Sequence, residues 1–289
     1  MADGNPELDN LLLILSEHPH ESENLVFKIL SFFPWGYSPS LYIEKMHDPQ
    51  KRMVLRDSIS LFLFKIKQLQ DLELLLQNPH DARINEKGAF LLSCSNENMN
   101  YSYNEFAEKL DLLAAPLEKK FQSHDNITEK NKIKIFVQYF FRELAFCGEQ
   151  ENSQLPDNFI FQKVLDSKKG GAIHLCVLAN AIASRAGIEL PVVITAGHFL
   201  LRTKIENEIP FIDPLQNGRI VSEQEHMSNV AAKGYDPSIA LLHIYSPFTL
   251  FQNLARNLIH VYQTSQNNAM LENMREIRGL LKNYIDKNS

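Results

Sequence analysis

The chain has 289 residues, of which 44% are hydrophobic and 22% are charged, a composition typical of a globular protein. Its net charge of −6 argues against nucleic-acid binding, because a domain with that function usually presents a basic face. No apolar run approaches the roughly 18 to 20 residues that a membrane span needs, and the acidic first ten residues lack the features of a signal peptide.

The three cysteines are Cys94, Cys147 and Cys176. They are widely spaced and form no CxxC pair, so we expect neither a disulfide framework nor a zinc cluster. The expected compartment is therefore the cytoplasm, and no cofactor or metal is expected. Cys94 and Cys147 lie in segments that are expected to be helical, where packing is the simplest role for them.

Residues 1–82 predict helices only. An apolar run from Leu11 to Leu15 indicates a short helix, and residues 21–33 indicate a second one. A long helix is expected from about Gln50 to Asn78, because apolar residues recur along it at helical spacing and Pro79 would end it.

Residues 85–146 predict three further helices. The second carries an apolar stripe from Phe106 to Leu117, which indicates core packing, and Pro116 is expected to kink or end it. Thr128 has a side chain suited to a helix N-cap and precedes the third helix.

Strands are expected only in the part of the chain that follows. Gly170 and Gly171 open a helix that should run to about Ala186. The segments LPVVITA, HFLLRTKI and IPFIDPL then have the apolar runs and alternation of strands. Because helices and strands are segregated, the sequence predicts an α+β fold with a helix packed on a small antiparallel sheet.

Residues 247–289 return to helical periodicity, with one apolar stripe from Phe251 to Tyr262 and another from Met274 to Tyr284. The expected regions are thus three. They are a helical N-terminal extension at 1–82, an α+β domain at 83–246 with a helical part at 83–147 and a core at 148–246, and a helical tail at 247–289.

Three short segments carry the residue types of a cysteine hydrolase: the helix start at 170–172, Gly197-His198-Phe199 and Ile212-Asp213-Pro214. Such an enzyme needs a thiol at a helix N-terminus, a histidine that accepts its proton and a carboxylate that orients the histidine. A tight turn near residues 205–207 would place His198 roughly opposite Asp213, with Cβ atoms about 5 Å apart. Such a pair would equally serve to fix the strand register.

Longer stretches carry a family resemblance. NFIFQKVLDSKKGGAIHLCVLANAIASRAGIELPV, AGHFLLR and PFIDPLQNGRIV resemble the SirB1-type branch of the transglutaminase-like superfamily. The similarity extends upstream through YNEFAEKLDLLAAPLEKKF and IFVQYFFRELAFCGE, and downstream through LFQNLARNLIHVYQ, where it implies a TPR-like helix pair. It covers roughly residues 83–286 and implies a transglutaminase-like, papain-like core.

The resemblance assigns roles to three positions. His198 matches the histidine and Asp213 the aspartate of the triad, whereas Ala172 occupies the nucleophile position. Because alanine cannot attack a carbonyl, the triad is a remnant. Cys176 lies one helical turn beyond Ala172, about 6 Å along the axis, and is expected to be buried and inert. His174 is expected to be a surface residue without a role.

Three functions follow from these residues. The leading hypothesis is a non-catalytic, transglutaminase-like binding module whose partner is another protein or a peptide, with no nucleic acid and no membrane insertion. The alternative is a cysteine-type amidohydrolase, protease or acyl transferase in which Cys176 acts with His198 and Asp213. The third is hydrolysis by water that His198 and Asp213 activate. The substrate and the oligomeric state are left open by the sequence.

Overall fold

The computed structural model describes residues 5–19, 23–33, 39, 43–44, 46–95, 102–124, 126–149, 156–195, 198–206, 208–236 and 246–288. The chain divides into two compact units, residues 1–71 and 72–289. Gly197, the first residue of the expected Gly-His-Phe segment, lies outside the described residues. Within the described residues, no helix has the length and apolar character to cross a membrane.

The first unit is helical, as the sequence predicts. It contains α1 (Pro6–Glu17), α2 (Glu23–Ser31) and the first part of α4 (Pro49–Leu76), which agrees with the expected long helix to within two residues. Asn5 caps α1 by accepting hydrogen bonds from two backbone amides of its first turn. Apolar side chains of the three helices form one core, which includes Leu8, Leu12, Leu15, Val26, Ile29, Leu55 and Ile59.

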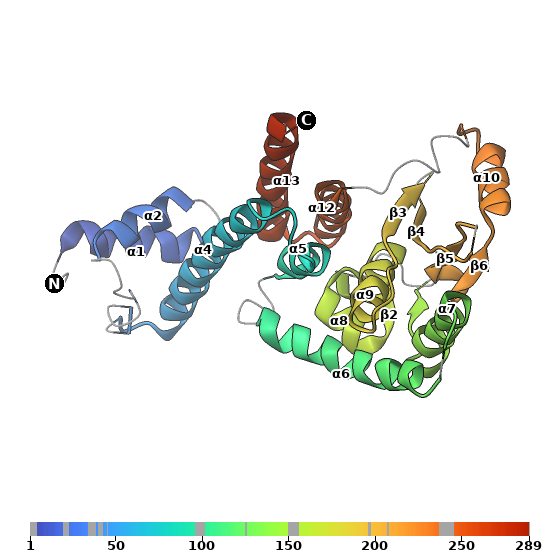
Figure 1. Ribbon diagram of the computed structural model, residues 1–289. Coiled ribbons are helices and arrows are strands. Elements are labelled where there is room, and N and C mark those ends of the chain that lie inside the picture. Colours follow the sequence, from blue (N-terminus) through green and yellow to red (C-terminus); the bar gives the residue numbers. More distant parts are fainter. Residues whose placement is uncertain are drawn as a thin grey trace. The chain divides into compact units, whose positions relative to one another are not determined.

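After the end of α4, the second unit contains the three expected helices, α5 (Ile84–Ser93), α6 (Tyr103–Gln122) and α7 (Glu129–Gln138). Thr128 caps α7 through its side chain, as predicted. The helix continues into a π-helical turn, η1 (Tyr139–Glu143). A short helix, α8 (Phe161–Ser167), precedes the central helix α9 (Ala172–Arg185), which contacts α5, α6 and α8 as well as the sheet (Figure 1).

Pro116 does not end α6, so one of the two effects expected from the sequence, a kink or an end, is excluded. The helix continues for six residues beyond it. A proline inside a helix removes one backbone donor and disturbs the preceding turn, so carbonyls of that turn need other partners. In that turn, the carbonyl of Leu113 also accepts a hydrogen bond of 2.7 Å from the Tyr139 hydroxyl.

The sheet has four antiparallel strands in the order β3 (Val192–Thr195), β4 (His198–Arg202), β5 (Phe211–Asp213) and β6 (Arg219–Val221). With the surrounding helices, it confirms the predicted α+β class. The sequence predicted the first three strands but neither β6 nor α10 (Glu223–Ala232), which follows it. Ser222 caps α10 by accepting from the Glu225 amide.

The two faces of the sheet have different neighbours, because successive side chains on a strand point to opposite faces. Val193, Leu200 and Phe211 form a buried cluster on one face. The ring of Phe211 lies 4.4 Å, centroid to centroid, from that of His226 on α10. Leu201 and Ile212 alternate with this cluster and are fully buried, on the face toward α9.

A second, two-stranded sheet pairs β1 (Cys147–Gly148) with β2 (Lys169–Gly170) in parallel, immediately before α9. Cys147 is therefore in a strand and not in a helix, contrary to the sequence-based expectation. A helix cannot extend to this residue, because Ala145 adopts a left-handed backbone with φ of 60°. The Cys147 amide instead donates to the carbonyl of Lys168.

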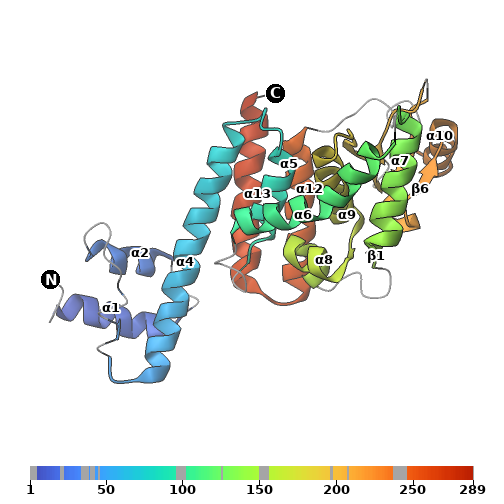
Figure 2. The same cartoon turned by 60° about the horizontal axis from the view of Figure 1, so that its bottom comes forward.

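The C-terminal helices α12 (Pro247–Thr264) and α13 (Asn268–Asn288) run side by side (Figures 1 and 2). They belong to the second compact unit, and α12 packs directly on α5. Gly88 makes this contact possible: a Cβ atom on it would lie 2.1 Å from the ring of Phe251. The Tyr284 hydroxyl donates to the carbonyl of Leu76, which ties α13 to the end of α4.

Candidate functional site

The N-terminus of α9 holds Ala172, the residue that the sequence resemblance assigns to the nucleophile position of a cysteine hydrolase. Ala172 is the first residue of the helix and is partly exposed. Gly171 is the N-cap and has extended backbone angles, but it offers no side chain to the first turn. The helix start is therefore placed as the sequence predicted, and its first residue carries only a methyl group, which is not a nucleophile.

Cys176 lies one turn further along α9 and is completely buried, as expected. Burial raises the pKa of the Cys176 thiol well above its ordinary value, and the negative charge of Asp213 raises it further. Because only the thiolate is a strong nucleophile, a thiol held in its protonated form inside the core is chemically inert.

His174 is fully buried, and the expectation that it lies on the surface was wrong. Its ring packs between those of Phe159 and Phe161, at centroid distances of 5.4 and 4.7 Å. Neither ring nitrogen has a hydrogen-bond partner among the described residues. Burial lowers the pKa of His174 to about 3, and the backbone of Phe159 acts in the opposite direction to a smaller extent.

The structure does not place His198 opposite Asp213, so this prediction was wrong. In the β4–β5 pair, Leu201 lies opposite Ile212 and Arg202 opposite Phe211. Continuing this register by one residue brings Leu200 level with Asp213. His198 is therefore two positions away, roughly 7 Å along the strand.

His198 is exposed, and its Nε2 atom contacts the Nζ atom of Lys233 at the end of α10. It shares the strand face of Leu200, which is the face covered by α10 and not the one toward α9. His226 lies nearby, and its Nε2 atom is 3.1 Å from the hydroxyl of Thr195. Burial lowers the pKa of His226, and the charges of His198 and Lys233 lower it further.

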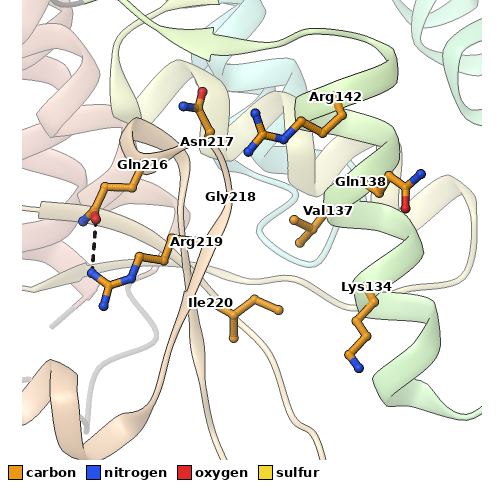
Figure 3. Close-up of a pocket in the computed structure, with 9 residues that line it drawn as sticks. All are labelled: Lys134, Val137, Gln138, Arg142, Gln216, Asn217, Gly218, Arg219 and Ile220. Atoms are coloured by element: carbon orange, nitrogen blue, oxygen red, sulfur yellow. Dashed lines mark hydrogen bonds between the residues drawn. The ribbon is translucent and has the colours of Figure 1, made fainter.

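The Asp213 carboxylate accepts hydrogen bonds from residues of the turn that follows it. Its Oδ1 atom accepts from the amide of Leu215 at 2.9 Å, and thereby caps the short 3-10 helix η3 (Pro214–Gln216). Its Oδ2 atom accepts from the Gln216 side chain at 2.7 Å. Gln216 in turn accepts from Arg219 (Figure 3). Another nitrogen of Arg219 donates to Glu225.

The predicted triad positions are therefore close in the fold but not coupled. Asp213 is near enough to α9 for its charge to act on Cys176, whereas His198 has other neighbours. The described residues contain no group of three or more His, Cys, Asp or Glu side chains that could hold a metal ion. Asp213 therefore caps η3, and His198 pairs within the sheet. The described residues do not form the chain of hydrogen bonds from carboxylate through imidazole to a nucleophile that a triad needs.

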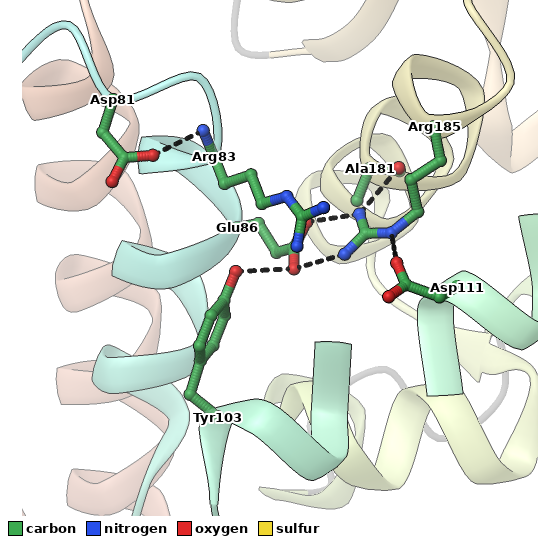
Figure 4. A network of polar contacts seen from close by, with 7 residues as sticks. All are labelled: Asp81, Arg83, Glu86, Tyr103, Asp111, Ala181 and Arg185. Atoms are coloured by element: carbon green, nitrogen blue, oxygen red, sulfur yellow. Dashed lines mark hydrogen bonds and ion pairs between the residues drawn. The ribbon is translucent and has the colours of Figure 1, made fainter. Parts of the chain in front are cut away.

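Sequence reasoning missed the polar network that anchors the other end of α9 (Figure 4). The guanidinium of Arg185 donates to both carboxylate oxygens of Glu86, at 2.6 and 3.0 Å, and to Asp111 of α6. Glu86 also accepts from the Tyr103 hydroxyl. Glu86 and Arg185 are 99 residues apart, so no local pattern signals their pairing.

Comparisons with known proteins agree with this architecture. The model of the transglutaminase-like superfamily matches residues 104–257, more than half of the chain. A UPF0162 protein of Xylella fastidiosa (strain 9a5c) is 31% identical over 137 residues, which are 45% of this chain and 49% of that protein. A UPF0162 protein of Pasteurella multocida (strain Pm70) is 24% identical over 140 residues, 47% of this chain and 53% of that protein. The chain thus spans about half the length of the curated relatives it matches, and no solved structure matches it.

Proposed function

The chain belongs to the transglutaminase-like superfamily, and we propose that it is a non-catalytic member that binds another protein through its C-terminal helices. Two finer assignments form part of this proposal and rest on the sequence resemblance. They are membership in the SirB1-type branch and the TPR-like character of α12 and α13. We also propose the cytosol as the compartment, because all three cysteines are free thiols.

The site around α9 supports the absence of catalysis. Ala172 offers no nucleophile, and Cys176 is a buried thiol whose pKa is raised. His198 contacts Lys233, so it is not oriented by Asp213 toward either position. An amidohydrolase, protease or acyl transferase would need at least one nucleophile that is exposed and activated by a neighbouring base.

The observation that carries the binding proposal is a groove between α12 and α13 with a volume of about 890 Å³. Four basic side chains and one acidic side chain line it, namely Arg256, Arg275, Arg278, Lys282 and Asp286. This excess of positive charge occurs in a chain whose net charge is −6. The groove is therefore a local basic surface on an acidic protein.

Two of the basic residues have no carboxylate partner in the part of the chain that the structure describes. Arg275 pairs with Glu272, and Arg256 donates to Asn253, so these two are held by neighbours. No ion pair joins Arg278 or Lys282 to another described residue. They are four positions apart on α13 and so lie on the same face of the helix.

The groove fits an acidic peptide segment that also carries apolar residues. Carboxylates of such a segment would pair with Arg278 and Lys282, while Ile259 and Ile285 in the same groove offer apolar contacts. Grooves between helices commonly accept peptides in this way, and complementary charge accelerates encounter and suppresses wrong partners.

A binding titration tests this proposal. A fluorescent peptide of glutamate, aspartate and leucine residues is titrated with the full chain, and its anisotropy is followed. We expect saturable binding that the double substitution Arg278→Ala/Lys282→Ala weakens by about tenfold or more. The matched control is Lys119→Ala/Lys130→Ala, which removes two exposed charges outside the groove. Equal weakening by both pairs, or no saturable binding, would overturn the proposal.

A further inference from the structure

A second basic hollow lies in the same unit, between α7–η1 and the turn that joins β5 to β6. Its volume is about 560 Å³, within the range of small-molecule sites, which is roughly 300 to 1,000 Å³. Lys134, Arg142 and Arg219 line it together with three amide side chains. None of its lining residues carries a carboxylate.

Of the three basic side chains, only Arg219 forms an ion pair with a described carboxylate. Arg219 donates to the carboxylate of Glu225 and to Gln216. Lys134 and Arg142 form no ion pair with any other described residue. Figure 3 shows the Arg142 guanidinium extending from the helix toward Asn217 on the opposite wall. Two positive charges without an ion-pair partner among the described residues therefore line the same hollow.

The two walls are held in a fixed relation. Gly218 has φ of 77°, and a Cβ atom on it would lie 2.3 Å from Cδ2 of Phe141 in η1, so the turn packs directly against the π-helix. The turn is further fixed by the bond from the Gly218 amide to the carbonyl of Asp213. Single π-helical turns occur frequently at functional sites, and this one places Arg142 at the hollow.

We propose that this hollow is a binding site for a small molecule that carries two or more oxyanion groups, either phosphates or carboxylates. The planar fork of Arg142 matches two oxygens of such a group, and Lys134 adds a point charge. Gln138, Gln216 and Asn217 offer neutral donors, while Val137 and Ile220 supply apolar contact. The proposal concerns a different surface from the α12–α13 groove and does not depend on the protein-binding function.

Calorimetric titration of the full chain with pyrophosphate, and separately with citrate, tests the proposal at low ionic strength. We expect saturable binding of one anion per chain for at least one probe. Arg142→Ala should weaken it about tenfold, and Arg142→Lys less, because lysine keeps the charge but loses the fork. Binding of pyrophosphate alone identifies a phosphate site and binding of citrate alone a carboxylate site, whereas binding of both indicates general oxyanion recognition.

Two controls separate this site from general attraction to basic surfaces. Lys130→Ala removes an exposed charge of the same helix that does not line the hollow, and Arg278→Ala/Lys282→Ala removes two charges from the α12–α13 groove. Neither should change the affinity for the anion. Absence of saturable binding to both probes, or an equal loss in either control, would overturn the proposal. A thermal melt of each variant verifies that it is folded.

Discussion

His198 lies two strand positions away from the point on β4 that is level with Asp213, and each side chain has found a different partner. His198 contacts Lys233 of α10, and Asp213 caps η3 and binds Gln216. In a working triad, the carboxylate holds the imidazole in one tautomer and the imidazole faces the nucleophile. Here neither condition is met, which fits an alanine at the start of α9.

The first prediction concerns the reactivity of Cys176. Iodoacetamide at about pH 7.5 should alkylate the partly exposed Cys147 first in the folded protein. Cys176 should react only on unfolding, because its thiol is buried and its pKa is raised. Mass spectrometry of peptides from a labelling time course measures both sites. Rapid labelling of Cys176 that His198→Ala suppresses would contradict the non-catalytic proposal and favour the cysteine enzyme.

Acid should destabilise the protein through His174. The pKa of this buried side chain is lowered to about 3 in the folded protein. At mildly acidic pH, His174 therefore stays neutral in the folded protein, whereas in the unfolded chain it takes up a proton below about pH 6.5. The stabilisation is complete above pH 6.5 and is lost as the pH falls toward 3. At pH 5 the expected loss is about 2 kcal/mol of unfolding free energy.

His174→Leu tests this assignment, because leucine fills similar space without a titrating group. Urea denaturation of both proteins at pH 8 and at pH 5 gives the two differences in free energy. The variant should lose about 2 kcal/mol less between these pH values than the wild type. An identical pH dependence in both proteins would show that His174 is protonated or solvated in the folded state.

The pair of Glu86 and Arg185 should be essential for stability. Arg185→Met leaves the Glu86 carboxylate buried without a cationic partner. This should lower the free energy of unfolding by about 3 kcal/mol, the lower end of the cost of breaking a buried pair. We expect the lower end because the other partner of Arg185, Asp111, is exposed. Glu86→Leu/Arg185→Met should recover much of this loss, since it removes both charges. Lys109→Met, which breaks the exposed pair with Asp166, is the control and should change stability by less than about 1 kcal/mol. The change in stability is measured from the midpoint of urea denaturation, provided that the dependence of the unfolding free energy on urea concentration is the same in all variants.

Two glycines in helices should respond in opposite directions to alanine. Gly88→Ala would place a methyl group in the ring of Phe251 and should destabilise the α5–α12 contact by about 1 to 3 kcal/mol. Gly279→Ala in α13 meets no atom within 4 Å and should stabilise by roughly 0.5 to 1 kcal/mol. Adding Phe251→Leu should relieve part of the Gly88→Ala loss. Thermal melts rank the variants, and equal effects at the two glycines would disprove the close packing.

The register between β4 and β5 could not be predicted from the sequence. The chain reverses between Ile205 and Glu208, whose backbones exchange two hydrogen bonds of 3.0 Å. A reversal one residue earlier would have placed His198 opposite Asp213. Such a shift moves the register by two residues and leaves every side chain on the same face. Apolar alternation is therefore identical in both registers and cannot distinguish them.

Apart from α8 and α10, the sequence by itself determined the helices, and it also determined the first three strands of the sheet and the residue at the start of α9. These features depend on neighbours along the chain: periodic apolar residues, the Thr128 cap and the alanine at position 172. The sequence also indicated membership in the transglutaminase-like superfamily, because contiguous segments carry the resemblance.

Only the tertiary structure decided which side chains meet. It directed His198 toward α10, buried His174 between two phenylalanines and paired Glu86 with Arg185 across 99 residues. It also brought Arg142 to the turn after β5. These contacts depend on strand register and on the packing of distant elements, and the free energies that set them come from burial and charge pairing between segments that no local pattern links.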